Sequence, residues 1–269
     1  MIRISRVTAF ATSIPGRAQS YVFDRLYGVS TTADPAFSID GDNNPYEGAQ
    51  WLPVRRALRR LGPGPRDVFV DLGSGKGRML LIAGRLPYGR VIGVEIDEAL
   101  GLCAQENIRQ AERRLRAAEI TSVTASVLEW PVPDDLSVVF LFNPFMRQTF
   151  QRALERIIES YDRHPRDLRI MYCLPAEHDW LVSTGRVVVE SVSRAFWPSH
   201  RGWWRRGDVL VIYRVVPVSR GRRAARDPAP SARRNSALRH WSGPNGLKLV
   251  LKSSPEGVFY SPASADLFS

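Results

Sequence analysis

The sequence predicts an α/β fold in which helices join five parallel strands and an antiparallel pair closes the sheet. Between residues 67 and 174, apolar runs typical of buried strands alternate with segments of helical spacing. Such alternation favours a parallel sheet with right-handed crossovers. The last two apolar runs, residues 186–197 and 208–216, are joined by PSHRGWWRRG, which has no room for a helix. These two runs are therefore expected to pair in antiparallel fashion.

The individual elements follow from local composition. Strands are expected where β-branched and aromatic residues form a continuous apolar run, and helices where apolar residues recur every three or four positions. The turn GPGP at 62–65 ends the first helix. In chain order we expect a helix at 48–61, strands at 67–72 and 90–97, helices at 78–86 and 98–117, strands at 120–126 and 136–143, a helix at 147–161 and a strand at 167–174.

Length and composition fit one main domain. The chain has 269 residues, of which 44% are hydrophobic. No apolar run is long enough to cross a membrane and the first residues do not resemble a secretory signal, so a cytoplasmic location is expected. The spacing of Cys103, Cys173 and the four histidines matches no disulfide framework and no metal site.

The charge of the chain is strongly positive but unevenly distributed. Residues 217–269 hold nine Lys or Arg and three Asp or Glu, so they carry +6 of the formal +11. Nucleic acid is therefore a possible partner that the sequence does not favour. The composition divides the chain into an N-terminal segment (1–47), a main domain (48–217) and a basic tail (218–269). The tail is expected to be disordered apart from a short hairpin across SSPEG.

The N-terminal segment is expected to pack on the main domain. Between residues 21 and 47 it is polar and rich in turns, but it contains aromatic residues that need apolar partners. These are Tyr21, Phe23, Tyr27, Phe37 and Tyr46.

A glycine-rich turn, DLGSGKG, follows the first predicted strand. Its glycines, Gly73, Gly75 and Gly77, are spaced GxGxG, unlike the GxGxxG of dinucleotide-binding turns. Glycine lets a ligand approach the backbone closely. Asp71 precedes the turn, and its carboxylate suits a ligand with a cationic amino group but would repel a pyrophosphate. Such ligands bind beyond the carboxyl ends of parallel strands.

Two further motifs fall at the same edge of the predicted sheet. GVEID places Glu95 at the end of the second strand, where a carboxylate can accept hydrogen bonds from both hydroxyls of a ribose, and Asp97 is a second candidate. LFNPF follows the fourth strand. Its Asn-Pro step fixes an extended turn that exposes the Asn143 amide oxygen, next to Pro144, with Phe145 available for stacking.

Together, YGVST, PYEG, FVDLGSGKGR, VIGVEID and FLFNPF resemble the class I S-adenosylmethionine-dependent methyltransferases, and in particular a bacterial group of them. The resemblance covers residues 21–216. It implies a Rossmann-like, mostly parallel sheet of seven strands with a terminal antiparallel hairpin and helices on both faces, S-adenosylmethionine as cofactor, and a transferase activity.

The resemblance also implies roles for individual residues. Asp71, Gly73, Ser74, Gly75 and Gly77 would line the methionine end of the cofactor, and Glu95 would bind its ribose. The remaining cofactor positions implied are Glu47 before the first helix, Ser126 and Val127 after the third strand, and Asn143.

The sequence departs from the family pattern at two places. After the third strand, TASVLEW has no acidic residue near the adenine, which leaves the backbone at Val127 and stacking on Trp130 as alternatives. The NPF motif, expected to supply the catalytic residues Asn143, Pro144 and Phe145, lacks the second proline of methyltransferases that act on planar nitrogens.

A substrate site is expected in the hairpin loop. If the sixth strand runs parallel to the first five, this loop emerges at the cofactor edge, where Trp197, Trp203 and Trp204 could form an aromatic wall. Methyl transfer needs a general base only if the acceptor must lose a proton. The candidates for such a base are Glu47, His178, Asp179 and His200.

Three functions are therefore weighed. The first is methyl transfer to an unidentified acceptor, with a small molecule favoured over protein or nucleic acid. The second is a nicotinamide-dependent oxidoreductase, which Asp71 and the glycine spacing disfavour. The third is a non-catalytic module of the same fold that docks nucleic acid or protein through its basic surface.

Overall fold

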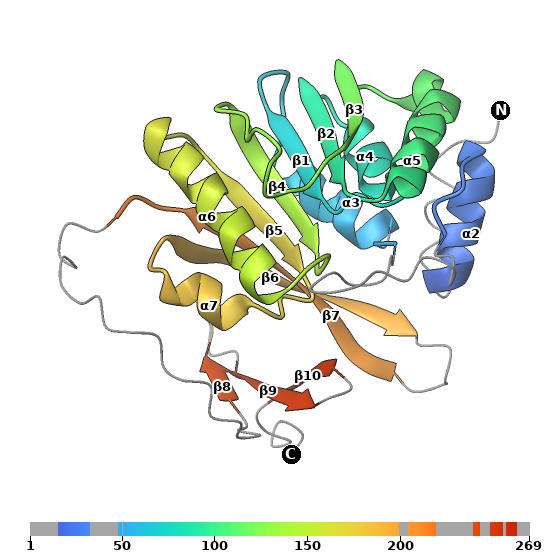
Figure 1. The fold of residues 1–269 in the computed structure, drawn as a ribbon. Coiled ribbons are helices and arrows are strands. Elements are labelled where there is room, and N and C mark those ends of the chain that lie inside the picture. The colour runs from blue at the N-terminus through green and yellow to red at the C-terminus, as the bar shows by residue number, and fades with distance from the viewer. Residues whose placement is uncertain are drawn as a thin grey trace.

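The structure of the chain is a computed structural model that describes residues 16–32, 48–49, 51–198, 204–218, 239–242, 248–254 and 257–262. Its central element is a seven-stranded sheet with the order β3-β2-β1-β4-β5-β7-β6. Figure 1 shows this sheet with helices on both sides. The strands are β1 (Val68–Leu72), β2 (Arg90–Glu95), β3 (Glu119–Thr124), β4 (Leu136–Phe142), β5 (Arg169–Cys173), β6 (Val187–Pro198) and β7 (Trp204–Val215).

The direction of the strands confirms the predicted fold class. Strands β1 to β5 pair in parallel, whereas β7 is antiparallel to both β5 and β6. Because β7 lies between β5 and β6, strand β6 runs in the same direction as the first five. The loop after β6 therefore leaves the sheet at its carboxyl edge. Cys173 at the end of β5 pairs with Leu210, whereas β6 and β7 remain paired as far as Pro198 and Trp204, so the hairpin extends past that edge.

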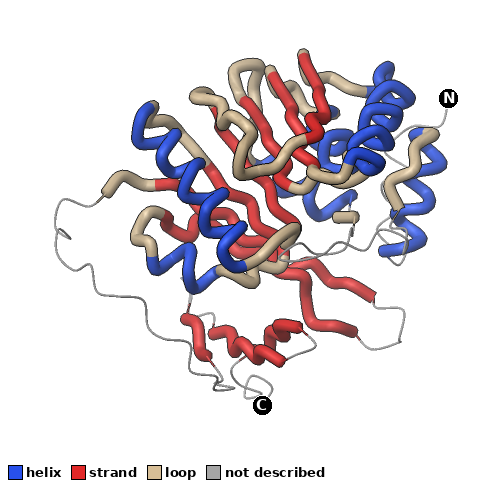
Figure 2. Tube along the Cα trace, viewed as in Figure 1, coloured by secondary structure: helices blue, strands red, loops and turns tan. Residues whose placement is uncertain are grey.

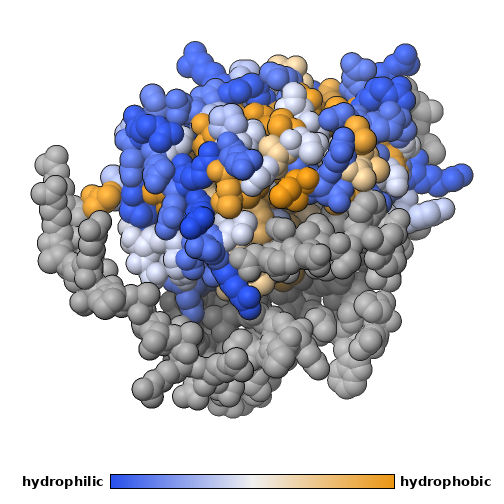
Figure 3. All heavy atoms as spheres, in the orientation of Figure 1, coloured by the Kyte–Doolittle hydropathy of each residue, from blue (hydrophilic) through white to orange (hydrophobic). Residues whose placement is uncertain are grey.

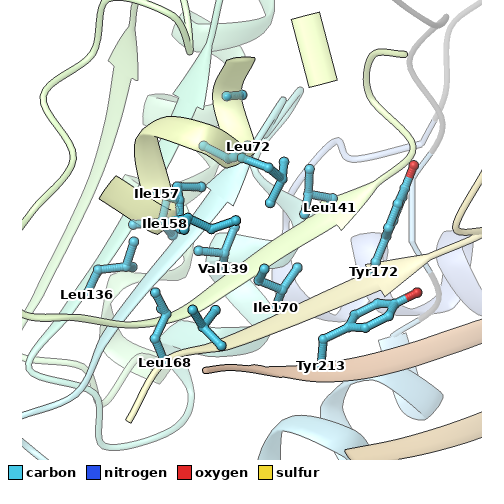
Figure 4. Packing of buried hydrophobic residues seen from close by; sticks show 14 of the residues in the cluster. Leu72, Leu136, Val139, Leu141, Ile157, Ile158, Leu168, Ile170, Tyr172 and Tyr213 are labelled. Atoms are coloured by element: carbon cyan, nitrogen blue, oxygen red, sulfur yellow. The ribbon is translucent and has the colours of Figure 1, made fainter. Parts of the chain in front are cut away.

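Two hydrophobic clusters, one on each face of the sheet, form the core. The helices are α2 (Gly16–Tyr27), α3 (Trp51–Arg60), α4 (Arg78–Gly84), α5 (Glu98–Ala111), α6 (Arg147–Arg163) and α7 (His178–Ser183). Helices α2 to α5 contribute to one cluster, and α6 and α7 to the other; Figure 2 shows the strands between these layers. Figure 4 shows the second cluster, with the Tyr172 and Tyr213 hydroxyls pointing away from its aliphatic side chains.

Helices α2 and α7 were not predicted. Helix α2 occupies part of the segment that the sequence suggested was rich in turns, because its polar side chains hide the helical pattern. Phe23 and Tyr27 are buried against Trp51 as expected, but Tyr21 is 65% exposed, which corrects the expectation that it packs in the core. Helix α5 is shorter than predicted, since it ends at Ala111 and a 3-10 turn follows. The outer faces of α5 and α6 are hydrophilic (Figure 3).

The tail contains a second, three-stranded sheet of β8 (Arg239–Ser242), β9 (Lys248–Ser254) and β10 (Gly257–Pro262). The hairpin predicted across SSPEG corresponds to the antiparallel pair of β9 and β10. Strand β8 was not predicted, and the expectation of disorder elsewhere in the tail concerns residues outside those described. No helix in the described ranges is long and apolar enough to cross a membrane.

Candidate active site

The glycine turn between β1 and α4 requires its glycines. Gly73, Gly75 and Gly77 have φ angles of 74°, 51° and 79°, in the left-handed region where glycine is least strained. A Cβ on Gly73 would overlap the ring of Pro144 after β4, and one on Gly77 would come within 2.9 Å of the Ala104 side chain in α5. The turn is thus held tightly between the β4 loop and α5, with its backbone at the carboxyl edge of the sheet.

Glu95 is fixed beside this turn by backbone hydrogen bonds. The Gly75 N–H donates to Glu95 Oε2 at 2.7 Å, and the Asp97 N–H donates to Oε1 at 3.0 Å. Burial raises the pKa of Glu95, while these bonds and one from Ile96 oppose the increase. A carboxylate oxygen can accept more than one hydrogen bond, so Glu95 is oriented and still able to receive hydroxyl donors.

Asp97, the second acidic candidate, has a structural role. Its side chain accepts a hydrogen bond from the Leu100 N–H at 2.9 Å and so caps the N-terminus of α5.

Asp71 is a buried carboxylate with no hydrogen bond from any described group; it is 3% exposed. Its neighbours Val70 and Leu72 point into the α6 cluster, so Asp71 faces the opposite side of the sheet. There it lies in register with Gly93, two residues before Glu95 on the same face. Burial, and then the charge of Glu95, raise the pKa of Asp71 well above its ordinary value. A cationic group at this position would offset both effects.

Ser74 adds a second buried polar group to the same turn. Its hydroxyl has no hydrogen-bond partner among the described residues. It occupies the space left by the missing side chain of Gly93, since a Cβ there would lie 2.6 Å from Ser74 Oγ. Buried polar groups without partners are rare in folded proteins, so the Ser74 hydroxyl beside the buried Asp71 carboxylate marks this turn as a candidate ligand site.

Backbone strain marks the carboxyl ends of β4 and β5. Asn143, Arg147 and Leu174 have φ angles of 48°, 52° and 50°, and no other non-glycine residue in the described ranges has a positive φ. Asn143 follows β4 and accepts a hydrogen bond from the Tyr172 hydroxyl at 3.3 Å, while Leu174 follows β5. Strain of this kind concentrates at functional sites.

The three residues of the NPF motif are not placed alike. Asn143 and Pro144 are partly exposed beside the glycine turn, but Phe145 is 3% exposed and packs in the α6 cluster. The ring of Phe145 is therefore covered by core side chains and does not present a face for stacking at the sheet edge.

Ser126 and Val127 lie in a tight turn after β3. The Ser126 carbonyl accepts hydrogen bonds from two following N–H groups, and Arg156 of α6 donates to the carbonyls of Val127 and Trp130. Ser126 and Val127 are half-buried, whereas Trp130 is buried in the core, which leaves it no free ring face. Ile96, which the sequence analysis overlooked, is 55% exposed between the two acids at the end of β2.

A hydrogen-bond network, also missed from sequence, fastens the N-terminal segment to the glycine turn. Arg78, the first residue of α4, is 3% exposed and donates to the Thr31 carbonyl and hydroxyl, the Ser20 hydroxyl and the Ala49 carbonyl at 2.7–2.9 Å. The Lys76 ammonium donates to a carbonyl of the same segment, so this lysine of GSGKG is engaged in packing.

Other predicted residues are buried, placed only by their backbone, or outside the described residues. Glu47, His200 and Trp203 are not among the described residues; Trp197 and Trp204 are placed only by backbone register in the hairpin. His178 is buried, its Nδ1 is 2.6 Å from the Tyr213 hydroxyl, and burial lowers its pKa.

No metal site and no disulfide are found among the described residues. No group of three or more His, Cys, Asp or Glu could hold a metal ion. Cys103 has a free thiol group.

Comparisons with known proteins give matches only among solved structures. No family model and no curated protein matches the chain. The chain is similar to an RNA methyltransferase from Salinibacter ruber in complex with S-adenosyl-L-homocysteine (19% identity, 64% of this chain and 98% of that one, TM-score 0.43). It is also similar to an rRNA methylase from Streptococcus thermophilus (10%, 64% and 100%, TM-score 0.47) and to the magnesium protoporphyrin IX methyltransferase from Synechocystis with bound S-adenosylmethionine (15%, 61% and 77%, TM-score 0.44). At these identities and TM-scores, the likeness gives no information on the reaction or acceptor of this chain.

Proposed function

We propose that the chain is an S-adenosylmethionine-dependent methyltransferase. The observation that carries the proposal is Asp71, a buried carboxylate that accepts no hydrogen bond from the described residues and that precedes a turn of left-handed glycines. A ligand bearing an ammonium group satisfies this carboxylate, whereas the pyrophosphate of a nicotinamide dinucleotide is repelled by it and by Glu95.

The remaining groups at this edge fit the other parts of S-adenosylmethionine. Glu95 is oriented by the Gly75 and Asp97 N–H groups and can accept hydrogen bonds from two ribose hydroxyls. Ile96 offers an exposed apolar surface to a planar base, and the half-buried backbone at Ser126 and Val127 follows the neighbouring strand. The ends of the adjacent strands β1, β2 and β3 thus offer groups that suit the ammonium group, the ribose and the base of one ligand.

In the reaction, the chain acts mainly by holding the reactants. The cofactor supplies an electrophilic methyl group, and no covalent protein nucleophile is required. The Asn143 oxygen accepts a hydrogen bond from the Tyr172 hydroxyl, and the next residue, Pro144, lies against Gly73 of the glycine turn. This oxygen is proposed to accept a hydrogen bond from the acceptor nucleophile. Orientation of this kind accounts for several kcal/mol of barrier reduction in enzymes generally.

The acceptor is proposed to meet the cofactor between the β4 loop and the β6–β7 hairpin, which extends past the same edge. A small molecule bound against Trp197, Trp203 and Trp204 is the acceptor that the sequence favours. A nucleic acid or protein acceptor would enter by the same side.

The cofactor is tested by calorimetric titration with S-adenosylmethionine and S-adenosylhomocysteine. Asp71→Asn and Glu95→Gln should each weaken binding roughly 10- to 100-fold, the equivalent of one charge-assisted hydrogen bond. Glu119→Gln, at the exposed amino end of β3, is the matched control and should bind as the wild type does. A folded wild-type protein that binds neither compound would refute the proposal. Binding without turnover across a panel of acceptors would instead favour the non-catalytic docking module.

A further inference from the structure

Two arginines lie over the buried ring of Tyr27, and two more are close enough to interact with them electrostatically. The guanidinium groups of Arg85 and Arg114 lie 5.0 and 5.3 Å from the centre of that ring. Arg85 also donates a hydrogen bond to the Tyr27 hydroxyl, and the charges of Arg85 and Arg59 both act on Arg55. Helix α3, the end of α4 and the turn after α5 thus bring their cationic groups together beside Tyr27 of α2.

Further arginines extend this group. Arg56 and Arg60 are exposed on α3 next to Arg55 and Arg59. Beyond α5, Arg113 and Arg116 are exposed, and the Arg116 N–H bonds to the carbonyl of the residue before Arg85. We call the whole set the arginine face; its members are Arg55, Arg56, Arg59, Arg60, Arg85, Arg113, Arg114 and Arg116.

The arginine face contains no ion pair within the described part of the chain. Other arginines of the described structure do form ion pairs. Arg90 pairs with an aspartate, Arg109 with Glu106, Arg163 with Asp134, and Arg169 and Arg186 with further carboxylates. The arginine face therefore differs from these positions in that its charges are not balanced by described carboxylates.

This arrangement carries an energetic cost in the free protein. Burial, and then the nearby charge of Arg85, lower the pKa of Arg55. The Nε groups of Arg55 and Arg85 are buried without hydrogen-bond partners among the described residues. Repulsion between like charges is relieved when a polyanion binds, because bound phosphates replace the missing carboxylates.

We propose that the arginine face binds the phosphodiester backbone of a nucleic-acid strand. Guanidinium groups match phosphate oxygens in bidentate geometry. Tyr21, 65% exposed on α2, provides an aromatic surface of the kind on which unpaired bases stack. Helix α4 has seven residues, so Arg85 at its end lies roughly 10 Å from the glycine turn at its start. A strand on this face can therefore reach the candidate active site, and a nucleic-acid acceptor would then displace the small molecule favoured by the sequence.

The test compares two double variants of the full chain with matched positions. Arg56→Gln/Arg60→Gln removes a mid-helix and a last-turn arginine from α3, and Arg152→Gln/Arg163→Gln does the same on α6 with an equal change in net charge. Fluorescence anisotropy without cofactor measures the affinity for a labelled 20-nucleotide single-stranded RNA, and for DNA of the same sequence, from 0.05 to 0.5 M KCl. Because the basic tail is present in every protein, its contribution cancels in the comparison.

Loss of two phosphate contacts should reduce the magnitude of the slope of log K against log [salt] by about 1.4. If affinities are equal when extrapolated to 1 M salt, the variant then binds about 25-fold more weakly than the wild type at 0.1 M salt. RNA and DNA should show the same reduction, and the α6 variant should bind as the wild type does. Absence of RNA binding by the wild type, or an equal loss in both variants, would overturn the proposal. Binding to vesicles of phosphatidylcholine and phosphatidylserine (3:1) that only the α3 variant loses, without RNA binding, would assign the face to a membrane surface instead. None of these outcomes depends on whether the chain binds S-adenosylmethionine.

Discussion

Asp71→Asn should make the protein more stable and a poorer binder of its cofactor. Asn keeps the size of the side chain but removes a charge that is buried and has no hydrogen-bond partner in the described structure. Removal of a buried charge should raise the free energy of unfolding by roughly 1–3 kcal/mol, and for a domain of this size the Tm rises by about 2–4 °C per kcal/mol.

The pH dependence has a definite sign. The folded-state pKa of Asp71 lies well above its ordinary value of 3.8, so between these two values the folded state binds more protons than the unfolded state. Stability therefore falls as the pH rises through this interval, and the full penalty is present above the folded-state pKa. The advantage of Asp71→Asn should therefore grow as the pH rises toward the folded-state pKa and should shrink as the pH falls toward 3.8.

Differential scanning calorimetry from pH 4 to 8 measures the first effect, and titration with S-adenosylhomocysteine measures the second. Glu119→Gln is the control for loss of one exposed carboxylate. A neutral-pH Tm below that of the wild type would mean that Asp71 stabilises the ligand-free fold, which would refute the reasoning. Unchanged affinity would separate Asp71 from the cofactor.

Three further changes test the geometry of the site. Gly73→Ala should lower both Tm and cofactor affinity, because its Cβ overlaps a neighbouring ring; Gly185→Ala, with a φ of 66° and open space around it, is the calorimetric control and should cost only the left-handed strain, about 1–2 kcal/mol. Ile96→Ser should leave the Tm within about 1 °C but weaken S-adenosylhomocysteine binding several-fold, since its side chain is 55% exposed. Trp203→Ala/Trp204→Ala should raise the KM for the acceptor and leave the cofactor Kd unchanged; equal losses in steady-state kinetics and titration would contradict a substrate role.

The sequence predicts those parts of the fold that depend on local pattern. Apolar runs locate all seven strands of the main sheet to within a few residues. The pattern is clearest for β1, β2, β4 and β5, because a strand buried on both faces has no polar side. The hairpin of β6 and β7 follows from a joining segment too short for a helix. Helix α2 could not be predicted in this way. It is stabilised by three stacked aromatic rings, of which two belong to α2 and one to α3. This contact joins residues far apart in the sequence, so the local residue pattern does not reveal it.

The candidate site likewise has residues that the sequence predicts and residues that it does not. Gly73, Gly75 and Glu95 are recognisable because spacing along the chain translates directly into the ends of neighbouring strands. Arg78 is not, because its partners Ser20 and Thr31 lie 58 and 47 residues away. The visible signal is a single charged residue at the start of an otherwise apolar helix, which composition alone does not distinguish from a solvated arginine.

Destabilising features are found at both proposed sites, as expected where a ligand completes the structure. At the carboxyl edge of the sheet, the unpaired Asp71 and the left-handed Asn143 and Leu174 each raise the free energy of the ligand-free state. At the other end of α4, repulsion between the charges of the arginine face also raises the free energy of the ligand-free state. Two packed hydrophobic clusters offset these terms. If ligands complete both sites, S-adenosylhomocysteine and single-stranded RNA should each raise the Tm. Asp71→Asn should remove the first rise alone, and Arg56→Gln/Arg60→Gln should reduce the second alone, because the two sets of charges are relieved by different ligands.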